Sequence, residues 1–206
     1  MKYLLKLLLI FPLFFTLNIE AAIIMKAGTV VACSTVTDET LTSYTTTAST
    51  ASDVYVNQYI GQQFVVAGSG SYTITEVDVY MAWYFAGAAE TVTVRIETDD
   101  TDSPSGTLLD ANATKQLTRA SFPEAAADDC DECTAITFTF PATFTGTYGT
   151  KYWVVVTSDA NAANDYEIMN SGDGTGYAYL TKYSGDQGSS WSVSANDKVF
   201  VVRGCP

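Results

Sequence analysis

Four cysteines carry the most definite chemistry of this 206-residue chain. Cys130 and Cys133 form a C-x-x-C motif inside the acidic segment 124–133, EAAADDCDEC, whereas Cys33 and Cys205 lie far apart in the sequence. Carboxylates beside a thiol raise its pKa, which disfavours a redox-active motif. A zinc site of four cysteines would need every thiol reduced, which export disfavours. Of the three possible pairings, the simplest is Cys33–Cys205 together with Cys130–Cys133.

A short acidic segment offers oxygen ligands for a cation. Asp99, Asp100 and Asp102 precede the segment 103–106, SPSG. Carboxylates at this density could bind Ca²⁺, the only cofactor that the sequence suggests. The spacing does not match an EF-hand loop, because Pro104 stands where a third ligand should be. The same residue types are typical of turns, and a solvated turn is the favoured interpretation.

Tyrosine and tryptophan side chains are the candidate ligand-binding groups, since sugar rings stack on exposed aromatic rings. The chain has 13 Tyr and 3 Trp. The candidates share predicted strand faces and are Tyr80, Tyr84, Tyr177, Tyr179, Tyr183 and Trp191. The alternative is that these rings cover the core or form cross-strand pairs.

The composition excludes several function classes. The chain has no histidine, which excludes Ser-His-Asp and Cys-His catalysis and histidine-ligated zinc. No pair of carboxylates stands in a spacing that demands catalysis, so we assign no catalytic residue and expect a protein that is not an enzyme. A formal net charge of −13 repels phosphate backbones, so we expect no nucleic-acid partner.

The segment 71–99 determines the predicted architecture. Between Glu76 and Phe85 apolar and polar residues alternate with a period of two, and the alternation resumes at Val92, Val94 and Ile96. Such a period is typical of half-buried strands. Each strand then has one apolar face, which must pack on a second sheet. Trp83 and Ile96 are therefore expected to be buried.

The pattern of the rest of the chain predicts further strands separated by Gly, Asp and Ser turns, and it predicts no amphipathic helix. Residues 151–157, KYWVVVT, are apolar on both faces and predict a central strand. Pro141 is expected to end a strand that begins at Ala135. The other expected strands are 54–66, 108–122, 166–169, 177–183, 191–193 and 197–203. The predicted fold is all-β, a two-sheet antiparallel β-sandwich of the jelly-roll-like class.

The N-terminal part predicts export. Residues 1–21 resemble a signal peptide, with a short apolar core and a cleavage site before Ala22; a retained anchor helix is the alternative. Residues 22–53 are a Ser/Thr-rich arm or linker, an edge strand, or an arm that adds to a neighbouring subunit. Residues 54–206 form the sandwich domain. Val30–Cys33 resembles a lipobox, so lipidation at Cys33 is a minority interpretation; otherwise no membrane association is expected after signal removal.

Several segments together suggest a family. In order along the chain they are IGQQF (60–64), YTITEVDVY (72–80), SPSGTLL (103–109), FTF (138–140), GTKYWVV (149–155), GSSW (188–191) and VFVVR (199–203). Over about residues 54–203 this pattern resembles the secreted bacterial and phage β-sandwich domains of the "choice-of-anchor" type. The resemblance implies an extracellular, non-catalytic, jelly-roll module and assigns no ligand-binding residues. The cysteines and the Thr-rich arm are not part of it.

The sequence therefore predicts a secreted, disulfide-stabilised, non-catalytic module for binding or assembly at a cell or particle surface. A glycan is the first ligand to test, and neighbouring subunits are the other expected partners. The alternative is a structural subunit of an extracellular filament, a surface layer or a virion.

Overall fold

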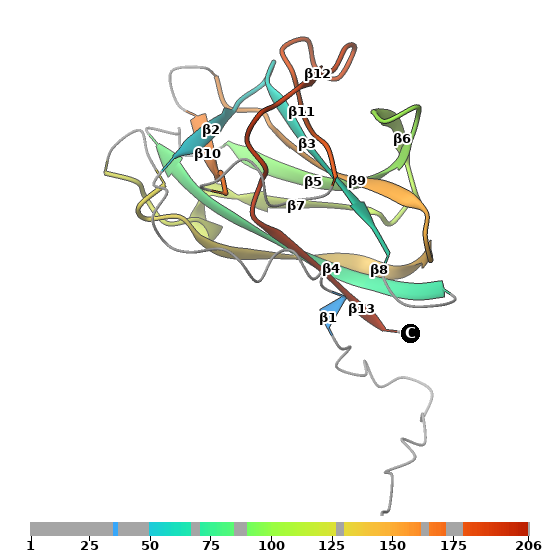
Figure 1. The fold of residues 1–206 in the computed structure, drawn as a ribbon. Helices are drawn as coiled ribbons and strands as arrows, with labels where there is room; N and C mark the ends of the chain where they lie inside the picture. The colour runs from blue at the N-terminus through green and yellow to red at the C-terminus, as the bar shows by residue number, and fades with distance from the viewer. Residues whose placement is uncertain are drawn as a thin grey trace, which may run out of the picture. The chain divides into compact units, whose positions relative to one another are not determined.

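The computed structural model describes residues 35–36, 50–66, 71–84, 90–126, 130–161, 165–171 and 179–205. The predicted signal peptide, Cys33 and Tyr177 lie outside these residues. The strands belong to one compact unit, Cys33–Pro206, and form two antiparallel sheets (Figure 1). The predicted two-sheet antiparallel β-sandwich is confirmed.

The first sheet, which we call sheet I, is built around one long strand. It follows the order β1-β13-β4-β10-β2, and β8 pairs with the opposite edge of β4. Its strands are β1 (Thr35–Val36), β2 (Ala51–Val54), β4 (Ser71–Tyr84), β8 (Thr134–Thr147), β10 (Asp165–Met169) and β13 (Phe200–Cys205). Part of the predicted arm therefore pairs within its own chain, because Thr35 and Val36 join β13 and residues 51–53 join β10.

The second sheet, sheet II, follows the order β12-β11-β3-β9-β5-β6, and β7 also pairs with β5. Its strands are β3 (Tyr59–Val65), β5 (Thr91–Asp99), β6 (Pro104–Leu108), β7 (Thr114–Thr118), β9 (Lys151–Ser158), β11 (Thr181–Ser184) and β12 (Ser192–Val193). A single 3₁₀ turn, η2 (Arg119–Ser121), follows β7. The central position predicted for 151–157 is confirmed, since β9 lies between β3 and β5.

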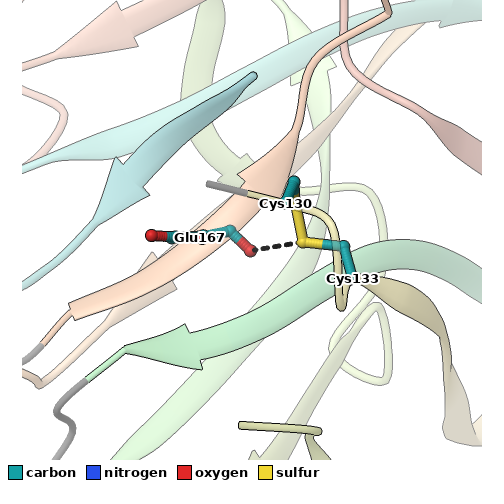
Figure 2. A group of neighbouring side chains, drawn as sticks. All are labelled: Cys130, Cys133 and Glu167. Atoms are coloured by element: carbon teal, nitrogen blue, oxygen red, sulfur yellow. Dashed lines mark hydrogen bonds between the residues drawn. A yellow bond between two sulfur atoms is a disulfide. The ribbon is translucent and has the colours of Figure 1, made fainter. Parts of the chain in front are cut away.

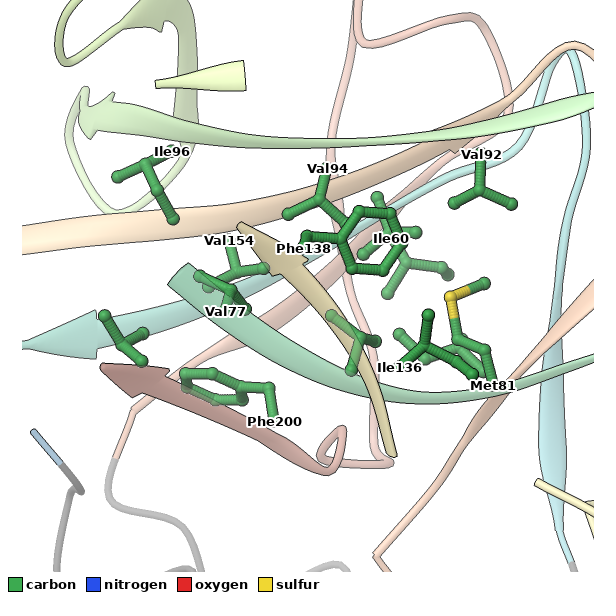
Figure 3. Close-up of a cluster of buried hydrophobic side chains, with 14 of the residues drawn as sticks. Ile60, Val77, Met81, Val92, Val94, Ile96, Ile136, Phe138, Val154 and Phe200 are labelled. Carbon is green, nitrogen blue, oxygen red and sulfur yellow. The ribbon is translucent and has the colours of Figure 1, made fainter. Parts of the chain in front are cut away.

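The core lies between the two sheets. Valines, isoleucines and phenylalanines from β4, β8 and β13 face those from β3, β5 and β9 (Figure 3). Trp83 is 8% exposed and Ile96 is fully buried, so the alternation that predicted two packed layers is confirmed. Burial of such side chains stabilises the fold by about 1.5–3 kcal/mol each.

One strand end was predicted wrongly. β8 continues past Pro141 to Thr147, whereas the sequence predicted an end at that proline. The register of β8 on β4 shifts between Ile74 and Glu76, so residues 140–143 lie in an irregularity of the ladder. A proline inside such a bulge removes no ladder hydrogen bond, which is why the strand continues.

No helix within the described parts of the chain is long and apolar enough to cross a membrane.

Candidate functional site

The acidic segment after β5 folds back over the outer face of sheet II. Asp99 Oδ1 accepts hydrogen bonds from the indole Nε1 of Trp153, at 2.7 Å, and from Nε2 of Gln63, at 2.9 Å. Both donors are fully buried or nearly so and point outward from β9 and β3. Asp102 Oδ1 accepts from Gln63 Nε2 at 3.2 Å and from Lys151 Nζ at 2.5 Å. We call these five side chains the sheet II network.

The turn geometry of the segment places these carboxylates. Thr101 and Asp102 have positive φ angles, 52° and 62°, which Asp adopts more readily than most residues. The backbone N–H of Asp102 donates to Asp99 Oδ2 at 3.2 Å, so one carboxylate caps the turn that carries the other. Pro104 then enters β6 and is buried against Gly61. The turn predicted from composition therefore forms, and it covers part of a sheet.

The predicted calcium ligands are brought together only in part. Asp99 and Asp102 share the Gln63 donor, whereas the Asp100 carboxylate is exposed and accepts from Thr101 Oγ1 at 3.2 Å. Hydrogen bonding from Lys151 lowers the pKa of Asp102, and the same bond raises the pKa of Lys151. The arrangement keeps the carboxylate charged by means of protein donors, and a cation at Asp102 would have to displace the Lys151 ammonium group.

A shallow open depression adjoins the sheet II network. Its volume is about 460 Å³, and its lining residues are Thr98, Asp99, Leu109, Thr150, Lys151 and Tyr152. Its lining combines the charged groups of Asp99 and Lys151 with the side chains of Leu109 and Tyr152.

Further along the same face, an aromatic pair lies over two glycines. An added Cβ on Gly61 would stand 3.3 Å from the Trp191 ring, and one on Gly188 would stand 3.4 Å from the Tyr59 ring. Gly188 also has a φ of 84°, which a side chain would strain. Trp191 and Tyr59 are both half-buried, so each ring keeps an accessible edge or face.

Polar side chains surround this aromatic pair. The Arg95 guanidinium lies 5.7 Å from the centroid of the Tyr59 ring and is ion-paired with the buried Glu97 at 2.8 Å. On the hairpin between β11 and β12, Gln187 Nε2 donates to Asn57 Oδ1 at 2.9 Å, and both residues are exposed. Hydrogen bonds from Ser190 and Ser184 lower the pKa of Asp186. Amide and carboxylate groups therefore lie on the hairpin that carries Trp191.

The structure places four of the other candidate tyrosines, whereas Tyr177 lies outside the described residues. Tyr80 and Tyr84 lie on β4, in sheet I, where they pack against a small apolar cluster that contains Cys130 and Cys133. Tyr183 is on β11 and is 45% exposed. It pairs with Ile60 of β3, so its side chain lies on the same side of sheet II as Ile60 and on the side opposite to Gly61. Tyr179 is partly buried in the segment before β11. Of the five predicted aromatic residues that the structure describes, Trp191 is the one that lies against Gly61 and Gly188, next to Tyr59.

The C-x-x-C motif forms a disulfide over sheet I. Cys130 and Cys133 are bonded to each other, with Cα atoms 4.8 Å apart, as the sequence predicted (Figure 2). Cys133 Sγ lies 3.9 Å from the backbone oxygen of Glu167 on β10, and a carboxylate oxygen of Glu167 lies within 4.8 Å of both sulfurs. Two thiolates and a carboxylate could bind a metal, but bonded sulfurs carry no thiolate charge. The side chains of Cys33 and Cys205 lie outside the described part of the chain.

The residues that organise the outer face of sheet II were not predicted from the sequence. Gln63 and Trp153 are predicted only as strand residues, and Lys151 only as the first residue of its strand. A signal was present, since adjacent glutamines inside an otherwise apolar strand must place at least one amide where it needs a partner. The identity of that partner could not be read from the sequence, because Asp99 lies 36 positions away.

Comparison with known proteins adds no family or function. No protein-family model matches this chain, and no curated protein matches it.

Proposed function

We propose that this chain is an exported, non-catalytic β-sandwich module that binds a glycan at a cell or particle surface. The observation that carries the proposal is the Trp191–Tyr59 pair on the outer face of sheet II. The close contacts of these rings with Gly61 and Gly188 hold them in place, so little side-chain entropy is left to lose when a flat ligand stacks on them.

Sugar recognition requires hydrogen-bonding groups next to an aromatic surface. Asn57, Gln187 and Asp186 are exposed and lie within two residues of Tyr59 or Gly188 in the sequence, so their amide and carboxylate groups are available to hydroxyls. Arg95 lies beside the Tyr59 ring and is held by Glu97, so it adds a fixed donor rather than a mobile one. A neutral or cationic glycan fits this acidic chain better than a sulfated or phosphorylated one, because the net charge of −13 repels anions.

Retention on insoluble polysaccharides and on a glycan array tests the proposal. The exported chain should be retained by at least one glycan, and Trp191→Ala should abolish that retention while the melting temperature stays within a few degrees. Tyr148→Ala is the matched control, because Tyr148 is an aromatic residue with 53% exposure elsewhere on the surface. Failure of the unaltered chain to bind any of the glycans would contradict the proposal, as would equal losses in the two variants.

A structural subunit is the second candidate. Val193 on the edge strand β12 is 64% exposed, and Tyr183 on the neighbouring strand is 45% exposed. Exposed apolar side chains at a sheet edge favour contact with another protein surface. If this edge joins copies of the chain, sedimentation should show an oligomer that Val193→Asp dissociates. A chain that is monomeric at all accessible concentrations would exclude this function.

A further inference from the structure

Lys198 and Asn170 form a buried pair between β10 and the segment that leads into β13. The two residues face each other across an isolated antiparallel bridge, which places their side chains on the same side of the backbone. Lys198 is 2% exposed and Asn170 is 1% exposed. Lys198 Nζ is in direct contact with Asn170 Oδ1, so it lies close to the carboxamide carbon Cγ that is bonded to this oxygen.

We infer that Lys198 and Asn170 react to form an intramolecular isopeptide bond. The reacting atoms are Nζ of Lys198 and Cγ of Asn170. The bond between Nζ and Cγ forms, the bond between Cγ and Nδ2 breaks, and a proton passes from Nζ to Nδ2 so that ammonia leaves. The reaction requires no oxidant, reductant or cofactor, because one amide is exchanged for another.

The surroundings of the asparagine polarise its carboxamide. Ser52 Oγ donates to Asn170 Oδ1 at 3.0 Å, at the oxygen where negative charge develops during attack on Cγ. Asn170 Nδ2 donates to the backbone oxygen of Ala51 at 2.8 Å, which fixes the plane of the amide. A carbonyl held by a hydroxyl donor in a buried site of low dielectric constant is more electrophilic than one in solution.

The surroundings of the lysine increase the fraction of neutral amine, which is the nucleophile. Burial lowers the pKa of Lys198 to about 8, although the negative charge of the neighbouring Asp197 acts in the opposite direction. Lys198 Nζ also donates to Ser52 Oγ at 2.8 Å, so the same hydroxyl contacts both the amine and the carbonyl oxygen and can accept the proton that Nζ loses before that proton reaches Nδ2.

Two other lysines provide a contrast within the chain. Lys151 is paired with the Asp102 carboxylate on the surface, and Lys182 Nζ donates to Ser103 Oγ at 2.7 Å. Neither partner is an electrophilic carbonyl. The bond between positions 170 and 198 would close a loop of 28 residues that contains the β11–β12 hairpin. Both ends of this loop adjoin strands of sheet I, so the bond would fasten the loop that carries Trp191 at its base by a link that reduction does not break.

Mass spectrometry of the exported full chain tests the inference. The intact mass should be lower by one molecule of ammonia, after allowance for signal removal and disulfides. After reduction and trypsin digestion, residues 152–182 and 183–203 should appear as one branched peptide joined through positions 170 and 198, with no cleavage after Lys198. Fragmentation then identifies the linked residues. Full mass together with separate peptides cleaved after Lys198 would overturn the inference.

Variants connect the mass change to this pair. Lys198→Met keeps an unbranched stem without an amine, so it should abolish the ammonia loss and lower the melting temperature. Lys115→Met is the control, because Lys115 lies on β7, away from this pair, and its variant should keep the ammonia loss. If Lys198→Met does not fold, the peptide map of the unaltered chain still decides. Ammonia loss that persists in folded Lys198→Met would also contradict the inference.

Discussion

The outer faces of the two sheets are covered in different ways. On sheet I the cover is an apolar cluster of Ala82, Ala125, Cys130, Cys133, Met169 and Val199, closed by a disulfide. On sheet II the cover is polar: Asp99 and Asp102 bind the outward-pointing side chains of Gln63 and Trp153. The first cover depends on covalent closure and exclusion of water, and the second depends on donor and acceptor groups that satisfy one another. The two faces should therefore respond to different perturbations.

The largest effect is expected from a second disulfide in sheet I. Thr35 pairs with Arg203 and Val36 with Val202, and the same register, if extended by two residues, would pair position 33 with position 205. We predict the bond Cys33–Cys205, whose loss in Cys33→Ala/Cys205→Ala should lower the free energy of unfolding by about 4–5 kcal/mol in the chain-entropy model. Non-reducing peptide maps identify the disulfide, and denaturant titration measures the change in the free energy of unfolding. A map that links either residue to Cys130 or Cys133 would refute the pairing.

The next largest effect is expected at the centre of the sheet II network. Trp153 is fully buried, so Trp153→Ala should lower the free energy of unfolding by about 3–5 kcal/mol. Trp153→Phe removes chiefly the hydrogen bond to Asp99 and should cost about 1–3 kcal/mol. Urea unfolding with and without reductant measures these changes. The decrease in the free energy of unfolding should be the same with and without reductant. A decrease that depends on reductant would show that the covers of the two sheets are not independent.

A smaller effect is expected from the C-x-x-C disulfide, because it closes a very short loop. Cys130→Ala/Cys133→Ala should lower the free energy of unfolding by about 2 kcal/mol. Hydrogen exchange should increase on β10, which the disulfide covers, and remain unchanged on β9. Increased exchange on β9 would mean that sheet II also depends on this bond.

The smallest effect is expected at the exposed ion pair between Asp102 and Lys151. The pKa of Asp102 is lowered in the folded state, so the stability that it contributes is present above its unfolded pKa, near 4, and is lost as pH falls through the folded value. Asp102→Asn should therefore lower the melting temperature slightly at pH 7, and the difference from the unaltered chain should shrink as the pH falls below about 4. Because Lys151 already contacts the carboxylate, Ca²⁺ should not shift the melting temperature of the unaltered chain. A shift with Ca²⁺ but not with Mg²⁺, absent in Asp102→Asn, would establish a calcium site.

The difference between the two faces also explains which parts of the structure could be predicted from the sequence. The period of two in β4 and β5 is local, so the buried faces of Val77, Met81 and Ile96 could be predicted. The Cys130–Cys133 bond is equally local. The partners of Gln63, Trp153 and Lys198 are distant in the sequence and are set by sheet order and register. Four cysteines, an acidic turn and scattered tyrosines do not contain that information.

The position of β4 has a consequence for the dynamics of the molecule. This strand is paired along one edge with β8 and along the other with β13 and then β10. Because successive N–H groups of a strand point to alternate edges, release of all the β4 amides requires the neighbours on both sides to separate, which amounts to opening all of sheet I. The amides of β4 should thus report the global unfolding equilibrium, whereas those of β12, a two-residue strand at the rim, report local fraying.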